Sequence, residues 1–216
     1  MLKNESKIKG ILAKVRADIM HDIEPCLNIN HTTGGFFSVP LILFSFIEYL
    51  GVLWKNPVEY INKKRVNYYL ESHIPKAAIP YIKKYLGKVR SEYKIYSGLL
   101  YGLYRHSIVH HYSPSEILVN NKILTWEIIK DSRENHLLCT KKKLCKENGK
   151  IIEKIILTIN IEIFYKDLLK SIDEFEKDAL KFKTISNNIL RADNKLNNPH
   201  PDIFLRKYIR DDLRNI

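Results

Sequence analysis

The chain has 216 residues, enough to bury a substantial core as one domain but too few to favour two independent ones. Apolar residues make up 45% and charged residues 28%, a balance that excludes an intrinsically disordered chain. Thirty-six Lys and Arg against 24 Asp and Glu leave a net charge of +12, which favours a polyanionic partner such as nucleic acid or an acidic protein; a composition rich in Lys, Ile and Asn can also reflect genome base composition.

The N-terminal residues predict the first helices. Between residues 5 and 27, apolar side chains recur at spacings of three and four, which predicts an amphipathic helix that ends near Pro25. A second helix is expected from about Phe37 to Leu53, with Pro40 in its first turn. Its composition raises the question of a membrane span. Because the segment contains Glu48, we expect a buried core helix and no membrane.

Cysteine usage and the N-terminus bear on the compartment. The three cysteines, Cys26, Cys139 and Cys145, form no CxxC pair, so neither a disulfide framework nor a zinc ribbon is indicated. Residues 1–7 lack the apolar stretch and cleavage site of a signal peptide. We therefore expect a cytoplasmic protein.

Residues 57–90 carry half of the net charge. This segment reads as two shorter helices broken at residues 72–75, with eight basic residues against Glu59 and Glu71. We expect it to form a basic surface that contacts RNA. The candidate contacts are Lys63, Lys64, Arg65, Lys83 and Lys84.

A further helix is predicted from Ser91, a candidate N-cap, to a point before Ser113-Pro114. Gly98 and Gly102 lie one turn apart in it. Glycine costs ~1 kcal/mol relative to alanine in a helix, so we expect a close approach of another helix at this face.

The second half of the chain has a different pattern. The β-branched runs at 117–119, 123–129, 136–139 and 151–163 predict strands, and Asn148-Gly149 predicts a hairpin tip. Residues 164–182 return to a helical period, residues 187–199 suggest a polar connection, and residues 201–213 predict a short helix. The expected fold class is therefore mainly α, a helical bundle with a small antiparallel sheet and C-terminal helices in one domain.

Residues 101–112 carry the most informative pattern. Arg105 is followed by His106 and then, after four and five intervening residues, by His110 and His111. In this pattern the chain resembles the HEPN superfamily, whose signature is Arg, a polar residue, and His after four to six intervening residues. The resemblance covers about residues 5–114. It implies a HEPN-like helical core at 1–114, with the strands and helices of 115–216 as an elaboration packed on it.

The resemblance implies a metal-independent endoribonuclease of a toxin or antiviral defence system. RNA supplies its own nucleophile, the 2′-OH, so proton transfer and charge stabilisation suffice, and we expect neither a metal nor another cofactor. His110 has the pKa range for moving the proton, and His111 is the alternative if five residues intervene. Arg105 can hold phosphate oxygens in its fork, and His106 would orient one of these groups or touch phosphate.

Geometry complicates this hypothesis. Five residues along a straight helix rotate by about 140°, so Arg105 and His110 would not share a face unless the helix deforms or the arginine wraps. The resemblance implies a homodimer with two motifs across one groove, and adds an antitoxin or defence-complex protein as a candidate partner.

Glu48 lies on an otherwise apolar helix, and a buried carboxylate needs a partner. It either pairs with Arg105 or a motif histidine, or stands exposed near the helix end.

Several alternatives remain open. His106 and His110 share a helical face and suggest zinc, but no third ligand is close in sequence. Arg105 and the histidines also suit a helix C-terminus, where positive charge is favourable and no enzyme is needed. Tyr112 is a candidate RNA contact, whereas Cys139 and Cys145, beside Lys141–Lys143, lack a companion histidine. The protein is then either the ribonuclease, a non-catalytic HEPN-like module that binds RNA or protein, or a structural partner in a larger complex.

Overall fold

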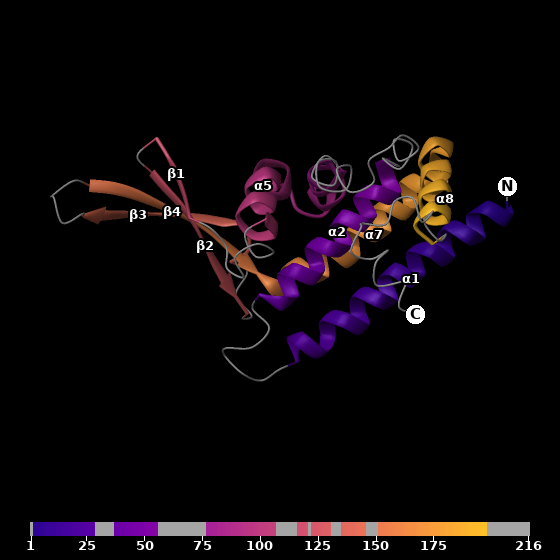
Figure 1. The fold of residues 1–216 in the computed structure, drawn as a ribbon, viewed down its shortest axis with the longest axis horizontal. Coiled ribbons are helices and arrows are strands. Elements are labelled where there is room, and N and C mark those ends of the chain that lie inside the picture. The colour runs from indigo at the N-terminus through magenta and orange to yellow at the C-terminus, as the bar shows by residue number, and fades with distance from the viewer. Residues whose placement is uncertain are drawn as a thin grey trace, which may run out of the picture.

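A computed structural model describes residues 2–28, 37–55, 77–106, 116–120, 122–130, 135–145 and 151–197. Within these ranges the protein is mainly helical with one small sheet, as the sequence predicts. The long helices α1 (Leu2–Leu27), α2 (Ser38–Lys55) and α7 (Ile161–Lys181) run side by side, with the sheet at one end and α8 (Lys183–Asn197) toward the other (Figure 1). The predicted short helix at 201–213 and the hairpin tip at Asn148-Gly149 lie outside the described residues.

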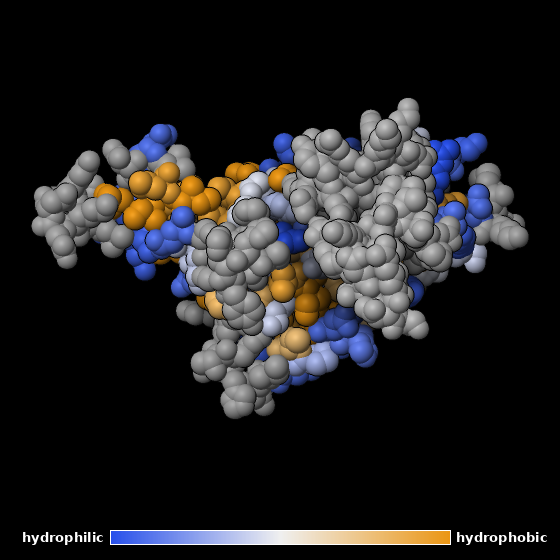
Figure 2. All heavy atoms as spheres, in the orientation of Figure 1, coloured by the Kyte–Doolittle hydropathy of each residue, from blue (hydrophilic) through white to orange (hydrophobic). Residues whose placement is uncertain are grey.

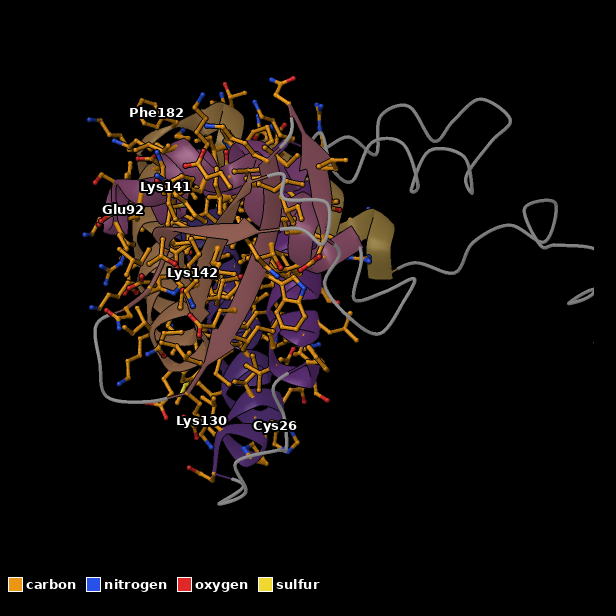
Figure 3. The ribbon with its side chains drawn as sticks, turned by 90° about the vertical axis from the view of Figure 1, so that its left-hand side faces the viewer. Cys26, Glu92, Lys130, Lys141, Lys142 and Phe182 are labelled. Atoms are coloured by element: carbon orange, nitrogen blue, oxygen red, sulfur yellow. The ribbon has the colours of Figure 1, made fainter. Side chains whose placement is uncertain are left out.

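The first helix, α1 (Leu2–Leu27), buries five residues of the predicted apolar stripe, Ile8, Leu12, Val15, Ile19 and Ile23, and partly buries the sixth, Ile11. It continues through Pro25 rather than ending there. The ammonium of Lys130, just after the second strand, donates to the carbonyl of Leu27. Lys130 and Cys26 lie near each other at this end of the molecule (Figure 3). A cation at the C-terminus of α1 is favourable, because the last carbonyls of a helix carry partial negative charge.

The second helix, α2 (Ser38–Lys55), lies in the centre of the bundle and is apolar on most sides. By length and composition it is the one helix in the described ranges that would suit a membrane span, and 56% of it is buried inside the protein. Gly51 explains how closely its neighbour packs. A Cβ built at Gly51 would lie 2.8 Å from the backbone carbonyl of Ala77, so only glycine fits at this contact.

The third helical segment contains two π-helical turns. Residues 77–81 are α-helical, and η2 (Ile82–Leu86), α4 (Gly87–Val89), α5 (Glu92–Leu100) and η3 (Tyr101–His106) follow. The predicted side-chain cap at Ser91 is absent, because its hydroxyl bonds the Glu92 carboxylate instead. The close approach expected at Gly98 and Gly102 is also wrong: a Cβ built at either glycine has nothing within 4 Å.

The sheet is mixed, which corrects the antiparallel prediction. It contains β1 (Ile117–Val119), β2 (Lys122–Ile129), β3 (Leu138–Cys145) and β4 (Ile151–Asn160) in the order β1-β2-β4-β3, with β2 and β4 parallel. The composition of the strands explains the order. The central strand β4 is rich in Ile and Leu, whereas β3 carries exposed Lys141, Lys142 and Lys143 and stays at the edge.

Two helices complete the described chain. Asn160 accepts hydrogen bonds from the N–H groups of Glu162 and Ile163, so α7 (Ile161–Lys181) begins where the sequence predicted strand to Ile163. The polar connection predicted from residue 187 is wrong as well, because α8 (Lys183–Asn197) covers that stretch. Both halves of the chain contribute to a single core. Hydrophobic residues also gather over the sheet (Figure 2), where Leu118 and Leu138 are exposed.

Candidate functional site

Arg105 lies in η3, the last described turn before the predicted motif histidines. A π-helix closes its hydrogen bonds between residues five apart, so its turn is wider than that of an α-helix. The turn ends at His106, and the deformation expected between Arg105 and His110 falls largely on residues outside the described ranges. π-Helical turns occur frequently at functional sites, and this one coincides with the first residues of the Arg–His pattern.

A buried carboxylate binds Arg105. Glu48, 8% exposed on α2, accepts from Nε of Arg105 through Oε1 at 2.7 Å and from Nη2 through Oε2 at 3.0 Å. The hydroxyl of Tyr101, one turn before Arg105, donates to the same Oε1 at 2.6 Å. Three donors therefore satisfy the carboxylate. Of the alternatives that the sequence left open, Glu48 is buried and pairs with Arg105.

Aromatic contacts fix the backbone around this pair. The ring of Tyr101 packs edge-on against Phe44, with 6.2 Å between ring centroids. The hydroxyl of Tyr104 donates to the carbonyl of Leu157 in β4 at 2.6 Å, which ties η3 to the sheet. Burial raises the pKa of both tyrosines, so their hydroxyls remain protonated donors.

The bond pattern leaves one edge of the guanidinium facing away from Glu48. Nε and Nη2 form the side engaged by the carboxylate, and Nη1 has no partner among the described residues. A planar guanidinium can hold a carboxylate on one edge and a phosphate oxygen on another. The side chain of Arg105 is 21% exposed.

Of the five predicted basic RNA contacts, two lie in the described ranges, both in η2. The ammonium of Lys84 is 3.2 Å from a carboxylate oxygen of Asp178 and 5.0 Å from the centroid of the Trp54 ring, so it holds η2 against α7 and α2. Lys83 is exposed. Lys84 is therefore engaged within the protein, and Lys83 faces solvent.

The rest of the predicted site lies outside the described residues. These residues are Lys63, Lys64, Arg65, His110, His111 and Tyr112. The backbone of His106 closes η3, but its side chain is outside the description. In the described ranges, no group of three or more His, Cys, Asp or Glu side chains could hold a metal ion.

A second buried polar cluster was not predicted. Tyr93 lies with its hydroxyl 2.7 Å from Nε2 of His136 and donates to Oδ2 of Asp167 at 3.3 Å, and Nε of Arg90 donates to the same oxygen at 3.1 Å. The backbone N–H of Asn160 donates to Nδ1 of His136. One signal for this cluster was present in the sequence: Asp167 interrupts the apolar stripe of α7, where a carboxylate needs a partner.

No protein-family model matches the chain, and neither a curated protein nor a solved structure is significantly similar to it.

Proposed function

We propose that the protein is a cytoplasmic, metal-independent endoribonuclease of the HEPN type, acting in a toxin or antiviral defence system. The observation that carries the proposal is the position of Arg105. Buried Glu48 holds one edge of its guanidinium in a π-helical turn, and Nη1, on the other edge, has no partner among the described residues. A preorganised cation at this point suits a phosphate on which negative charge develops.

In the proposed reaction the 2′-OH of one nucleotide attacks the adjacent phosphorus. The P–O bond to the 5′-oxygen of the next nucleotide breaks, which leaves a 2′,3′-cyclic phosphate and a 5′-hydroxyl. His110, or His111 if five residues intervene, accepts the 2′-OH proton or donates one to the departing oxygen. Arg105 stabilises the charge on the phosphate oxygens, Glu48 positions Arg105, and His106 orients one of these groups or contacts phosphate.

A homodimer would combine two motifs in one groove, with the exposed Lys83 and the basic residues of 57–90 guiding RNA to it. Sedimentation should then show a dimer at micromolar concentration. Full activity from a protein that remains monomeric would argue against this assembly.

A second candidate function follows from the same ion pair. Glu48 neutralises much of the charge of Arg105. An arginine used in this way suits a non-catalytic module that binds RNA or a partner protein, such as an antitoxin. Cleavage by the purified protein separates the two candidates, because the module binds RNA without cutting it.

The direct test is incubation of the purified protein with single-stranded RNA in EDTA. We expect cleavage that leaves 2′,3′-cyclic phosphate ends, identified by their mass, and 5′-hydroxyl ends on the other product, identified by labelling with a polynucleotide kinase. Loss of all cleavage on addition of EDTA would remove this mechanism and restore the zinc hypothesis.

A further inference from the structure

The sheet projects from the helical bundle, and its outer end is basic (Figure 1). The described residues of this end are 116–120, 122–124, 141–145 and 151–155, and they include five lysines and two glutamates. The lysines are Lys122, Lys141, Lys142, Lys143 and Lys154, and the glutamates are Glu116 and Glu153. Figure 3 views the molecule from this side, with Lys141 and Lys142 labelled. Ammonium groups therefore outnumber carboxylates at the outer end of the sheet.

The register of the strands brings these lysines together. Lys122 of β2 and Lys143 of β3 lie in one row, on either side of Glu153 in β4. Lys154 and Lys142 are partners in the next row. Adjacent strands lie about 4.8 Å apart, so the backbones of Lys122 and Lys143 are separated by about 10 Å. Successive side chains alternate between the faces of a sheet, so the two rows place positive charge on both faces.

The carboxylates neutralise only part of this charge. The ammonium of Lys122 is 2.7 Å from Oε2 of Glu153, and that of Lys154 is 2.8 Å from Oε1 of Glu116. The three consecutive lysines of β3, residues 141–143, are all exposed. The ammonium of the first is 3.8 Å from Glu153, which already pairs with Lys122. The lysines of β3 therefore supply the excess of positive charge.

Protection of the sheet edge does not account for the whole patch. Lysines on an edge strand such as β3 discourage pairing with another chain. However, Lys122 and Lys154 lie on β2 and β4, the two central strands of the sheet, which have no free edge to protect. Lysine is depleted in interfaces between proteins, whereas lysines make many of the contacts between proteins and nucleic-acid phosphates. The patch therefore suits a nucleic acid better than an acidic protein.

We infer that the outer end of the sheet binds the phosphate backbone of RNA. The inference rests on the proposed function in taking RNA as the polyanion. It adds a surface that is separate from Arg105 and from the basic segment 57–90 of the sequence. Each lysine that neutralises a phosphate releases bound counterions, which contributes to the affinity and to its dependence on salt. Phosphate contacts carry no base information, so this surface binds RNA without reading its sequence.

The affinity for a single-stranded RNA oligonucleotide, measured between 50 and 200 mM salt, tests the inference. The sheet variant replaces the three lysines of β3: Lys141→Gln, Lys142→Gln and Lys143→Gln. The matched control replaces three exposed lysines in the N-terminal half of α1, which points away from the sheet (Figure 1): Lys7→Gln, Lys9→Gln and Lys14→Gln. The two variants lose the same net charge, and circular dichroism verifies that both are folded.

We expect the sheet variant to bind RNA roughly 10-fold more weakly at the low end of this salt range. The slope of log affinity against log salt should fall by about 2, since each lost contact with a single strand removes about 0.7. The control should change the affinity by less than about threefold, because its lysines lie beyond the screening distance of about 10 Å.

Lysine acetylation of the wild type, read by mass spectrometry, supplies the second readout. Bound RNA should protect residues 141–143 of β3 and leave Lys7 and Lys9 of α1 reactive. Equal weakening by the two variants would show that only net charge matters, and would overturn the inference. So would a sheet variant that keeps its RNA affinity but no longer binds polyglutamate, because its lysines would then serve an acidic protein. A wild type that binds RNA through these lysines without ever cleaving it would remove the proposed ribonuclease and support this surface.

Discussion

The buried carboxylate of Glu48 in α2 accepts all its hydrogen bonds from two residues of the turn η3. Glu48 accepts from Tyr101 and from two nitrogens of Arg105 in a region where water has little access. Attraction between buried charges is strong, but their desolvation costs nearly as much. The pair therefore contributes chiefly by fixing where Arg105 lies, and removal of one member leaves the other charge without a partner.

Glu48→Ala should lower the free energy of unfolding by about 3–5 kcal/mol, because the variant leaves the guanidinium of Arg105 uncompensated. Urea unfolding at pH 7 measures the change. Adding Arg105→Met to Glu48→Ala should recover much of the loss, since an apolar side chain then replaces the isolated charge. A loss below about 1 kcal/mol for Glu48→Ala would show that the ion pair does not hold the turn.

His136 is a second residue whose environment fixes its state. The Asn160 N–H donates to Nδ1, so the ring proton lies on Nε2 and donates to the Tyr93 oxygen, and Tyr93 in turn donates to Asp167. Burial lowers the pKa of His136 from 6.5 to about 3, with a smaller contribution from the nearby charge of Arg90. The folded protein therefore holds this histidine neutral.

This lowered pKa predicts acid sensitivity. Between pH 6.5 and 3, His136 is protonated in the unfolded chain but neutral in the folded protein. The free energy of unfolding is therefore unaffected by this histidine above pH 6.5. Below pH 6.5 it falls by up to about 1.4 kcal/mol per pH unit as protons bind the unfolded chain. From pH 7.5 to 4.5, the wild type should lose about 3 kcal/mol more unfolding free energy than His136→Asn. Urea unfolding of both proteins at the two pH values provides the comparison. Equal losses would mean that His136 titrates normally in the folded state.

At the scale of elements, two helical glycines have opposite surroundings. Gly98 in α5 faces open space, so Gly98→Ala should raise the free energy of unfolding by about 0.5–1 kcal/mol through helix propensity. Gly51→Ala should lower it, because the new methyl would overlap the backbone of Ala77. Thermal unfolding of the two variants measures both signs. Destabilisation by Gly98→Ala would reveal a contact at that face.

The elements differ in how far the sequence predicts them. The stripe of α1 and the apolar α2 follow from local spacing, which is independent of the rest of the fold. The parallel pairing of β2 with β4 depends on which strand takes the buried centre, and only the competition among all strands decides that. Helix α8 was missed because its many asparagines suggest a turn, whereas packing against α2 stabilises it as a helix.

In the candidate site, too, some features follow from local sequence and others depend on the whole fold. Glu48 was identifiable as a lone carboxylate on an apolar helix, but the sequence left open whether it pairs with Arg105, pairs with a histidine or stands exposed; two hydrogen bonds show the pair with Arg105. The position of the π-helical turn was not predictable in detail, although the five-residue spacing required some deformation. His136 had no local signal, because its hydrogen-bond partners, Tyr93 of α5 and Asn160 of β4, meet it only in the folded chain.

At the scale of the whole molecule, the helices and the sheet meet at η3. This turn contacts α2 through Glu48 and the sheet through the Leu157 carbonyl, so both parts of the fold position Arg105. The net charge of +12, half of it within residues 57–90, comes from many side chains and would attract RNA without depending on any single residue. RNA binding and RNA cleavage should therefore respond differently to substitution in the motif.

The most direct test compares the cleavage rate and the RNA affinity of His110→Ala with those of the wild type. If His110 moves the proton, cleavage should fall by roughly 10²–10⁴-fold while affinity changes little. Arg105→Ala should impair cleavage and weaken RNA binding modestly. His111→Ala is the control for the spacing of the motif. If His111→Ala abolishes cleavage and His110→Ala does not, the motif has five intervening residues. Wild-type cleavage by all three folded variants, in preparations free of other nucleases, would contradict the assignment of the site.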